Sequence, residues 1–131
     1  DRIEWLRGLA NVLERPRRGE SPADRQRRDG EAVGFWTRVL EVSDDDRAAR
    51  REARQRIVGI WNRGGQLTDR VRDWQRALAG TPPDADAGRF LAEAYLRRRP
   101  RDVEAAERTL ERVTQLEPGD VESLLSLERV R

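Results

Sequence analysis

Hydrophobic residues recur at every third or fourth position along most of this chain, whereas strict alternation of apolar and polar residues is nearly absent. Such spacing is typical of amphipathic helices, because it gathers apolar side chains on one face of a helix. The pattern therefore predicts an all-α fold of about seven helices. The apolar stripes are Ile3, Leu6, Leu9, Ala10 and Leu13; Val33, Trp36, Val39 and Leu40; Ile57, Ile60 and Trp61; Val71, Trp74, Ala77 and Leu78; Phe90, Leu91, Ala94 and Tyr95; Val103, Ala106, Leu110 and Val113; and Val121, Leu124, Leu125 and Leu127.

The segments between these stripes contain residues that end one helix and cap the next. Four of them are 64–65 (Gly-Gly), 81–84 (Thr-Pro-Pro-Asp), 99–102 (Arg-Pro-Arg-Asp) and 117–120 (Glu-Pro-Gly-Asp). Ser43, with Asp46 three residues later, resembles a capping box. The segment from Arg15 to Gly30 contains two prolines, two glycines and six arginines. It predicts a long exposed loop between the first two helices.

The helical pattern also repeats along the chain. The spacing of Ala106, Leu110, Val113 and Pro118 is that of Arg70, Trp74, Ala77 and Pro82, and more loosely that of Ala32, Trp36, Val39 and Asp44. Trp74 follows Trp36 by 38 residues, and Leu110 follows Trp74 by 36 residues. Because an isolated helix pair cannot bury its own apolar face, this repetition predicts helix pairs stacked on one another.

These spacings resemble the tetratricopeptide repeat family, whose pattern combines a large residue late in its first helix, helix A, with a small and an aromatic residue in helix B and a closing Pro. The matching residues are Trp61, Gly65, Trp74, Ala77 and Pro82 in one repeat and Leu91, Ala92, Tyr95, Ala106, Leu110 and Pro118 in the next. The resemblance covers residues 50–131 and implies an α-solenoid of antiparallel helix pairs.

Four segments follow from this resemblance. Residues 1–49 form a divergent helix pair with the Arg-rich loop at 15–30, and residues 50–84 and 85–120 each form one repeat. Residues 121–131 resemble helix A of a further repeat whose helix B is missing. We therefore expect the natural protein to continue as a longer array.

Composition argues against catalysis. The 131 residues include no Cys, His or Met, which removes thiol nucleophiles, imidazole bases and every common zinc ligand set except carboxylates. The residues 44–46, all Asp, lack the spacing of a calcium loop and fit a helix start instead. The sequence thus predicts a protein that is not an enzyme and has no cofactor.

Charge gives little indication of a partner. Residues with charged side chains make up 40% of the chain, but the net charge is only +2, so no overall field favours nucleic acid or a membrane surface. All 27 basic residues are Arg, which we attribute to genome composition and which suggests a bacterial source. No apolar stretch is long enough to span a membrane. We expect a cytoplasmic location, although a chain without Cys is equally compatible with the periplasm.

The tetratricopeptide resemblance implies a concave groove lined by helix A side chains. Its expected lining comprises Gln55, Arg56, Asn62, Arg63, Arg89, Phe90, Glu93, Arg97, Leu125 and Arg129. Several arginines and an exposed aromatic ring in such a groove would suit an acidic or amphipathic peptide. The alternative is that these side chains form an ordinary solvated face.

Two other groups of residues could bind a partner. The arginines at positions 15, 17, 18, 25, 27 and 28 could contact phosphates, but acidic residues dilute them and no aromatic residue is interleaved for base stacking. A solvated loop is therefore favoured over nucleic-acid binding. Trp36, Trp61 and Trp74 lie on apolar stripes, which predicts core packing, whereas Trp5 could cover an exposed N-terminal edge.

The leading hypothesis from the sequence is a scaffold or adaptor that binds a peptide or another subunit and is part of a larger complex. The first alternative is the regulatory or recruiting arm of a larger enzyme. The second alternative is nucleic-acid binding through the Arg-rich loop, which would show a steep dependence on salt concentration.

Overall fold

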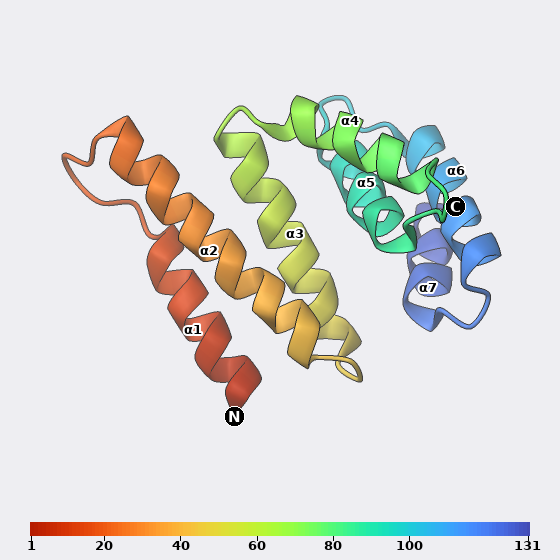
Figure 1. The fold of residues 1–131 in the computed structure, drawn as a ribbon, viewed down its shortest axis with the longest axis horizontal. Helices are drawn as coiled ribbons and strands as arrows, with labels where there is room; N and C mark the ends of the chain where they lie inside the picture. The colour runs from red at the N-terminus through yellow and green to blue at the C-terminus, as the bar shows by residue number, and fades with distance from the viewer. The chain divides into compact units, whose positions relative to one another are not determined.

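The computed structural model describes residues 1–131 and contains seven helices and no strands (Figure 1). The all-α class and the number of helices expected from the hydrophobic pattern are thus confirmed. The helices are α1 (Arg2–Glu14), α2 (Pro22–Val42), α3 (Arg47–Arg63), α4 (Leu67–Leu78), α5 (Ala85–Arg97), α6 (Val103–Leu116) and α7 (Val121–Val130). None of them is both long and apolar enough to cross a membrane.

The chain divides into two compact units, which are described separately below. Unit 1 comprises residues Asp1–Gly64, and unit 2 comprises residues Gly65–Arg131. This boundary lies inside the repeat expected at 50–84, so that α3 and α4 belong to different units. The Gly64-Gly65 pair lies at this boundary, and Gly65 has a φ of 74°, which favours glycine.

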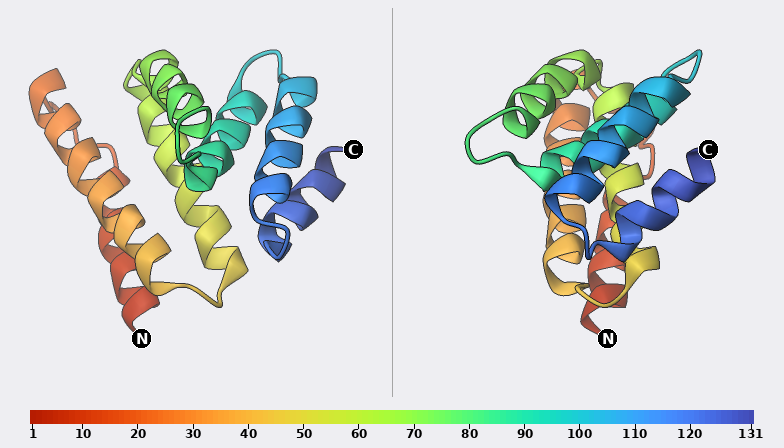
Figure 2. Two further views of the ribbon diagram at one scale, coloured as in Figure 1. Left: turned by 45° about the vertical axis from the view of Figure 1, so that its right-hand side comes forward. Right: turned by 90° about the vertical axis from the view of Figure 1, so that its right-hand side faces the viewer.

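Unit 1 is a three-helix unit in which α2 packs against both α1 and α3, and consecutive helices run in opposite directions (Figures 1 and 2). Trp36, on α2, is fully buried and is the largest side chain of the core. Its indole Nε1 donates a hydrogen bond of 2.8 Å to Glu14 at the end of α1. An ion pair of 2.6 Å between Arg7 and Glu52 also joins α1 to α3.

The tryptophans follow the sequence-based expectation only in part. Trp36 is buried as expected for a core residue, whereas Trp61 and Trp74 are half-buried. Trp5 is 60% exposed on α1. A stripe of apolar residues gives the face on which a ring lies, but not how completely a neighbouring helix covers it.

The expectation of a long loop at residues 15–30 is wrong for its second half, because α2 begins at Pro22. Ser21 is the N-cap of this helix, and its hydroxyl accepts a hydrogen bond of 3.1 Å from the backbone N–H of Asp24. Pro22 fits the first helical position, where no backbone N–H is needed and the fixed φ is already helical. Pro22, which the sequence pattern places in a loop, therefore starts a helix, and the loop covers only residues 15–21.

The capping box expected at Ser43 is also wrong. Asp46 is the N-cap of α3, and its carboxylate accepts a hydrogen bond of 3.0 Å from the backbone N–H of Ala49. Ser43 instead ends α2, and its hydroxyl donates to the carbonyl of Val39 within the preceding turn. A buried Ser can satisfy its hydroxyl in this way without capping the next helix.

Unit 2 consists of α4 to α7, in which each helix packs against the next one along the chain. Figure 2 shows the short turns that reverse the chain between α5, α6 and α7. Ala92, Leu110 and Leu127, one from each of these helices, form a buried cluster. At the other side of α5, Phe90 stacks on Trp74 of α4 with ring centroids 5.3 Å apart.

Unit 2 has a shorter repeat than the helix pair. Prolines recur every 18 residues at positions 82, 100 and 118, and so do aspartates at 84, 102 and 120. Each of these aspartates caps the helix that follows, accepting a hydrogen bond from the backbone N–H three residues later. One helix with one turn is thus the repeating element, and two such elements account for the spacing of 36 between Trp74 and Leu110.

Close packing in unit 2 gives a first prediction, for Gly88 on α5. A Cβ atom at this position would lie 2.5 Å from Val113 Cγ2 and 3.2 Å from Leu78 Cδ1. We expect Gly88→Ala to lower the free energy of unfolding by about 1–3 kcal/mol, because the core must shift to admit the methyl group. Urea unfolding followed by far-UV circular dichroism measures this change.

The matched control is Gly30, in the interior of α2. Nothing lies within 4 Å of a Cβ atom built there. Gly30→Ala is therefore expected to raise the free energy of unfolding by about 0.5–1 kcal/mol, the usual gain from replacing Gly by Ala inside a helix. A stabilising effect of both substitutions would contradict the close approach of α5 to α6.

Candidate functional site

The residues expected to line a groove from α3 are all exposed, but two of them are held by neighbouring acidic residues. Arg56 lies 3.6 Å from the Glu14 carboxylate and 5.7 Å from the centre of the Trp36 ring. Arg63 lies 3.7 Å from Glu14 and 4.0 Å from Asp29. Gln55 and Asn62 make no such side-chain contacts. The charges of Arg56 and Arg63 are therefore balanced largely within unit 1.

In unit 2, the expected groove residue Arg89 connects α5 to the turn before α7. Its guanidinium lies 2.7 Å from Asp120, 2.5 Å from Glu117 and 3.4 Å from Asp86, and the side chain is only 11% exposed. Burial by itself lowers the pKa of Arg89, but the hydrogen bonds to Asp120 and Glu117 outweigh it and raise the pKa. Arg89 remains charged and has an internal, structural role.

Asp120 is the acidic partner in this network. Burial by itself raises the pKa of Asp120, but hydrogen bonds from Ser123 and Arg89, together with the charge of Arg89, lower it below its ordinary value. The carboxylate also caps α7 by accepting from the backbone N–H of Ser123. One ionised side chain thus both starts α7 and joins it to α5.

The remaining expected groove residues of unit 2 differ in exposure. Phe90 is half-buried against Trp74, so it is not the exposed ring that was expected, and Glu93 is half-buried. Arg97 is exposed at the end of α5. Leu125 is 50% exposed, and Arg129 is exposed with a hydrogen bond of 3.0 Å to the Ser126 hydroxyl. Arg97 and Arg129 make no ion pair.

An apolar patch surrounds Leu125 on the outer face of α7. Val121, Leu124 and Leu125 are each 45–50% exposed, and their spacing of three and four residues places them on one face of the helix. The opposite face of α7, with Ser123 and Leu127, is buried against unit 2. The α7 patch, as we call these three residues, is the largest group of exposed aliphatic side chains on one helix.

A site that the sequence analysis did not identify lies in unit 1, between the 15–21 loop and the first turns of α2. It is a cavity of about 390 Å³. We call it the arginine pocket. Its lining comprises Leu13, Arg17, Arg18, Gly19, Glu20, Asp24, Arg27, Arg28 and Glu31. The pocket exists because α2 is longer than α1 by 8 residues, about 12 Å, so that the loop runs beside the overhanging part of α2 (Figure 1).

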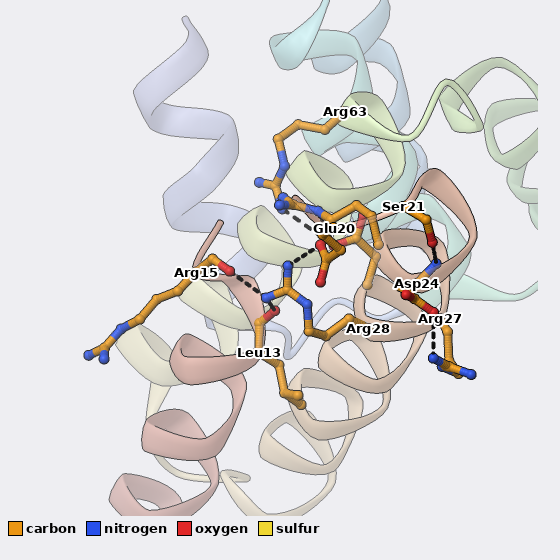
Figure 3. Close-up of polar contacts among 10 residues, drawn as sticks. Leu13, Arg15, Glu20, Ser21, Asp24, Arg27, Arg28 and Arg63 are labelled. Carbon is orange, nitrogen blue, oxygen red and sulfur yellow. Dashed lines mark hydrogen bonds and ion pairs between the residues drawn. The ribbon is translucent and has the colours of Figure 1, made fainter. Parts of the chain in front are cut away.

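Arg28 holds the loop in place along one side of this pocket (Figure 3). The residue is 5% exposed. Its guanidinium donates to the backbone carbonyls of Leu13, at 2.9 Å, and Arg15, and it pairs with the Glu20 carboxylate. Because α1 ends at Glu14, these bonds satisfy carbonyls that the helix leaves unpaired.

The ion pair with Arg28 also fixes the charge of Glu20. The hydrogen bond from Arg28 lowers the pKa of Glu20 against the opposing effect of burial, and the charges of Arg28, Arg25 and Arg17 lower it further. Glu20 therefore stays ionised at neutral pH. The same hydrogen bond raises the pKa of Arg28.

The six arginines of the predicted loop consequently fall into two groups. Arg25, Arg27 and Arg28 lie on α2 and pair with Asp29, Asp24 and Glu20. Arg15, Arg17 and Arg18 lie on the loop, and their side chains are exposed and make no hydrogen bond or ion pair. The spacing of Arg25 and Asp29, and of Asp24 and Arg27, is helical and indicates this division. That indication was hidden by the assignment of residues 22–30 to a loop.

Nothing in the arrangement indicates a metal centre. No group of three or more carboxylates converges where it could hold an ion. Comparisons with models of known protein families and with curated proteins found no match to this chain.

Proposed function

We propose that this protein is a non-catalytic helical scaffold that binds another protein through the α7 patch. The single observation that supports this function best is the exposure of Val121, Leu124 and Leu125 together on one face of α7. Exposed apolar side chains that form a group, rather than occurring singly, are typical of surfaces that bind proteins.

The expected occupant is an amphipathic helix of a partner protein, with acidic residues beside its apolar stripe. A helix places apolar residues at spacings of three, four and seven, which complements the same spacing on α7. Arg129, one turn beyond Leu125, is exposed and has no carboxylate partner, so it is available to an acidic residue of the partner. Leu125 and Arg129, expected in the groove from the sequence, both belong to this surface.

A photocrosslinking amino acid at position 125 tests this proposal in an extract of the source cells. We expect one protein to crosslink at position 125 and not at the exposed polar position Gln115 on α6. The crosslinked segment of that protein should be an amphipathic helix, and a peptide is made from it. This peptide should bind the purified chain and lose at least tenfold in affinity for the Leu124→Ser, Leu125→Ser variant.

Gln115→Ser is the matched control variant, and circular dichroism checks that both variants are folded. Equal crosslinking at positions 115 and 125, or undiminished binding by the double variant, would refute the assignment of the α7 patch. If light scattering shows a dimer of the wild type that the double variant does not form, the occupant of the α7 patch is a second copy of this chain and not a partner protein.

A further inference from the structure

We infer that the arginine pocket is a second binding site, which takes an oxyanion group carried by an extended acidic peptide. This site lies in unit 1 and is separate from the α7 patch in unit 2. It thus goes beyond the proposed function, and it is tested separately from it.

The pocket is formed by a loop that a buried side chain holds in place. Arg28, one of its lining residues, is 5% exposed and holds the loop by bonds to two carbonyls and to Glu20 (Figure 3). Gly19, with a φ of 73°, turns the loop, and the backbone N–H of Glu20 donates to the Arg17 carbonyl at 3.4 Å. Arg17 and Arg18 are therefore carried on a turn that is anchored at both ends.

The charges that line the pocket are not balanced. Four arginines and three carboxylates line the pocket, but Arg28 is paired with Glu20 and Arg27 with Asp24. The unpaired charges of the lining are therefore two guanidiniums, of Arg17 and Arg18, and one carboxylate, of Glu31. Two guanidiniums without acceptors favour an oxyanion, since their planar N–H groups match the geometry of carboxylate and phosphate oxygens.

The side chains of the lining also indicate the kind of ligand. Nucleic acid is disfavoured, because the lining has no aromatic side chain for base stacking and offers only two unpaired guanidiniums to a continuous phosphate backbone. An apolar small molecule is disfavoured as well, since Leu13 is the only large apolar side chain in the lining. A short acidic stretch of peptide carries one or two localised oxyanions. These supply the negatively charged partners that Arg17 and Arg18 lack.

Gly19 suits such an extended ligand. It lines the pocket, and nothing lies within 4 Å of the position that a Cβ atom would occupy. The backbone of the turn is therefore open to close approach by a peptide. This makes the backbone amide of Gly19 a local reporter of binding that does not depend on the arginines themselves.

The experiment uses three fluorescent peptides on the same Gly-Ser backbone, carrying two adjacent Glu residues, one phosphoserine, or two Gln residues. Anisotropy measures the affinity of the full chain, and the NMR signal of the Gly19 amide locates the site. We expect both acidic peptides to bind and to shift the Gly19 signal, with no binding of the Gln peptide. The acidic peptide with the higher affinity shows whether carboxylate or phosphate is the preferred oxyanion.

Three variants make the test specific. Arg17→Ser with Arg18→Ser should lower the affinity for the acidic peptides at least tenfold. Glu31→Gln should raise it about two- to fivefold, because it removes the opposing carboxylate. Arg47→Ser, at an exposed arginine near the opposite end of α2, should leave it unchanged. The double variant removes only exposed side chains that make no hydrogen bond or ion pair, so the fold is retained.

Several results would overturn the inference. An equal loss of affinity on Arg47→Ser would show diffuse attraction to the charged surface, and an unchanged Gly19 signal would place binding elsewhere. If inorganic phosphate shifts the NMR signal of the Gly19 amide at the same concentration as the phosphoserine peptide, the pocket is a site for a free small anion. The Leu124→Ser, Leu125→Ser variant should bind the acidic peptides normally, so failure at one surface is distinguishable from failure at the other.

Discussion

Replacement of Trp36 by Ala is expected to lower the free energy of unfolding of unit 1 by about 3–5 kcal/mol, the usual loss for an aromatic core residue. Trp36 is fully buried, and α2 is the helix against which both α1 and α3 pack. The substitution also leaves Glu14, whose side chain is 8% exposed, without the indole N–H donor. Urea unfolding of the full chain, followed by far-UV circular dichroism, measures the effect.

Two controls separate the causes. Trp36→Phe keeps most of the volume but removes the hydrogen bond to Glu14, and we expect it to lower the free energy of unfolding by about 1–2 kcal/mol. Trp5→Ala removes an equally large ring that is 60% exposed, and its effect should stay within about 0.5 kcal/mol. If Trp5→Ala were as destabilising as Trp36→Ala, the packing of α1 against α2 described here would be wrong.

The second large effect is expected in unit 2, where Asp120→Ala should lower the free energy of unfolding by about 2–3 kcal/mol. The loss of the N-cap of α7 contributes about 1 kcal/mol. Arg89, which is 11% exposed, also loses one of its acidic partners and so becomes a half-satisfied charge. Differential scanning calorimetry of the full chain measures this loss, and Asp69→Ala at an exposed pair on α4 is the control, with little expected change.

The charge of Asp120 adds a dependence on pH. Because its pKa is lowered in the folded state, its stabilising contribution is complete above the unfolded-state pKa and is lost as the pH falls through the folded-state pKa. Asp120→Asn keeps a good capping side chain but has no charge to titrate. The wild type should be more stable than this variant at neutral pH, and the difference should vanish in acid. A difference that is constant with pH would contradict the ion pair with Arg89.

Much of the secondary structure could be predicted, because amphipathic stripes give the existence and number of helices directly. The prediction is wrong at residues 22–30 because Pro disrupts the interior of a helix but is favoured at its first position, where Pro22 lies. Ser21 followed by Asp24 is the local signal that distinguishes them. The recurrence of Pro and Asp every 18 residues is also visible in the sequence, and it marks single helices rather than helix pairs.

The functional surfaces were less predictable. Helical spacing gives the face of a residue, but the partner that balances a charge comes from another helix. Arg89 reaches residues 28 and 31 positions later, and Arg63 reaches Glu14 from the far end of unit 1. The arginine pocket depends on the relative lengths of α1 and α2, which a boundary error of nine residues, 22–30, conceals. Leu125 and Arg129 could be identified because they lie on an exposed face of a single helix.

The 18-residue recurrence in unit 2 constrains how a chain of this kind can change in length. Each element of one helix and one turn reverses the direction of the chain, as α5, α6 and α7 show (Figure 2). Insertion or deletion of a single element would make every later helix run the opposite way. Two elements, or 36 residues, restore the original direction. Duplication by even numbers of helices is therefore the form of growth that preserves existing surfaces.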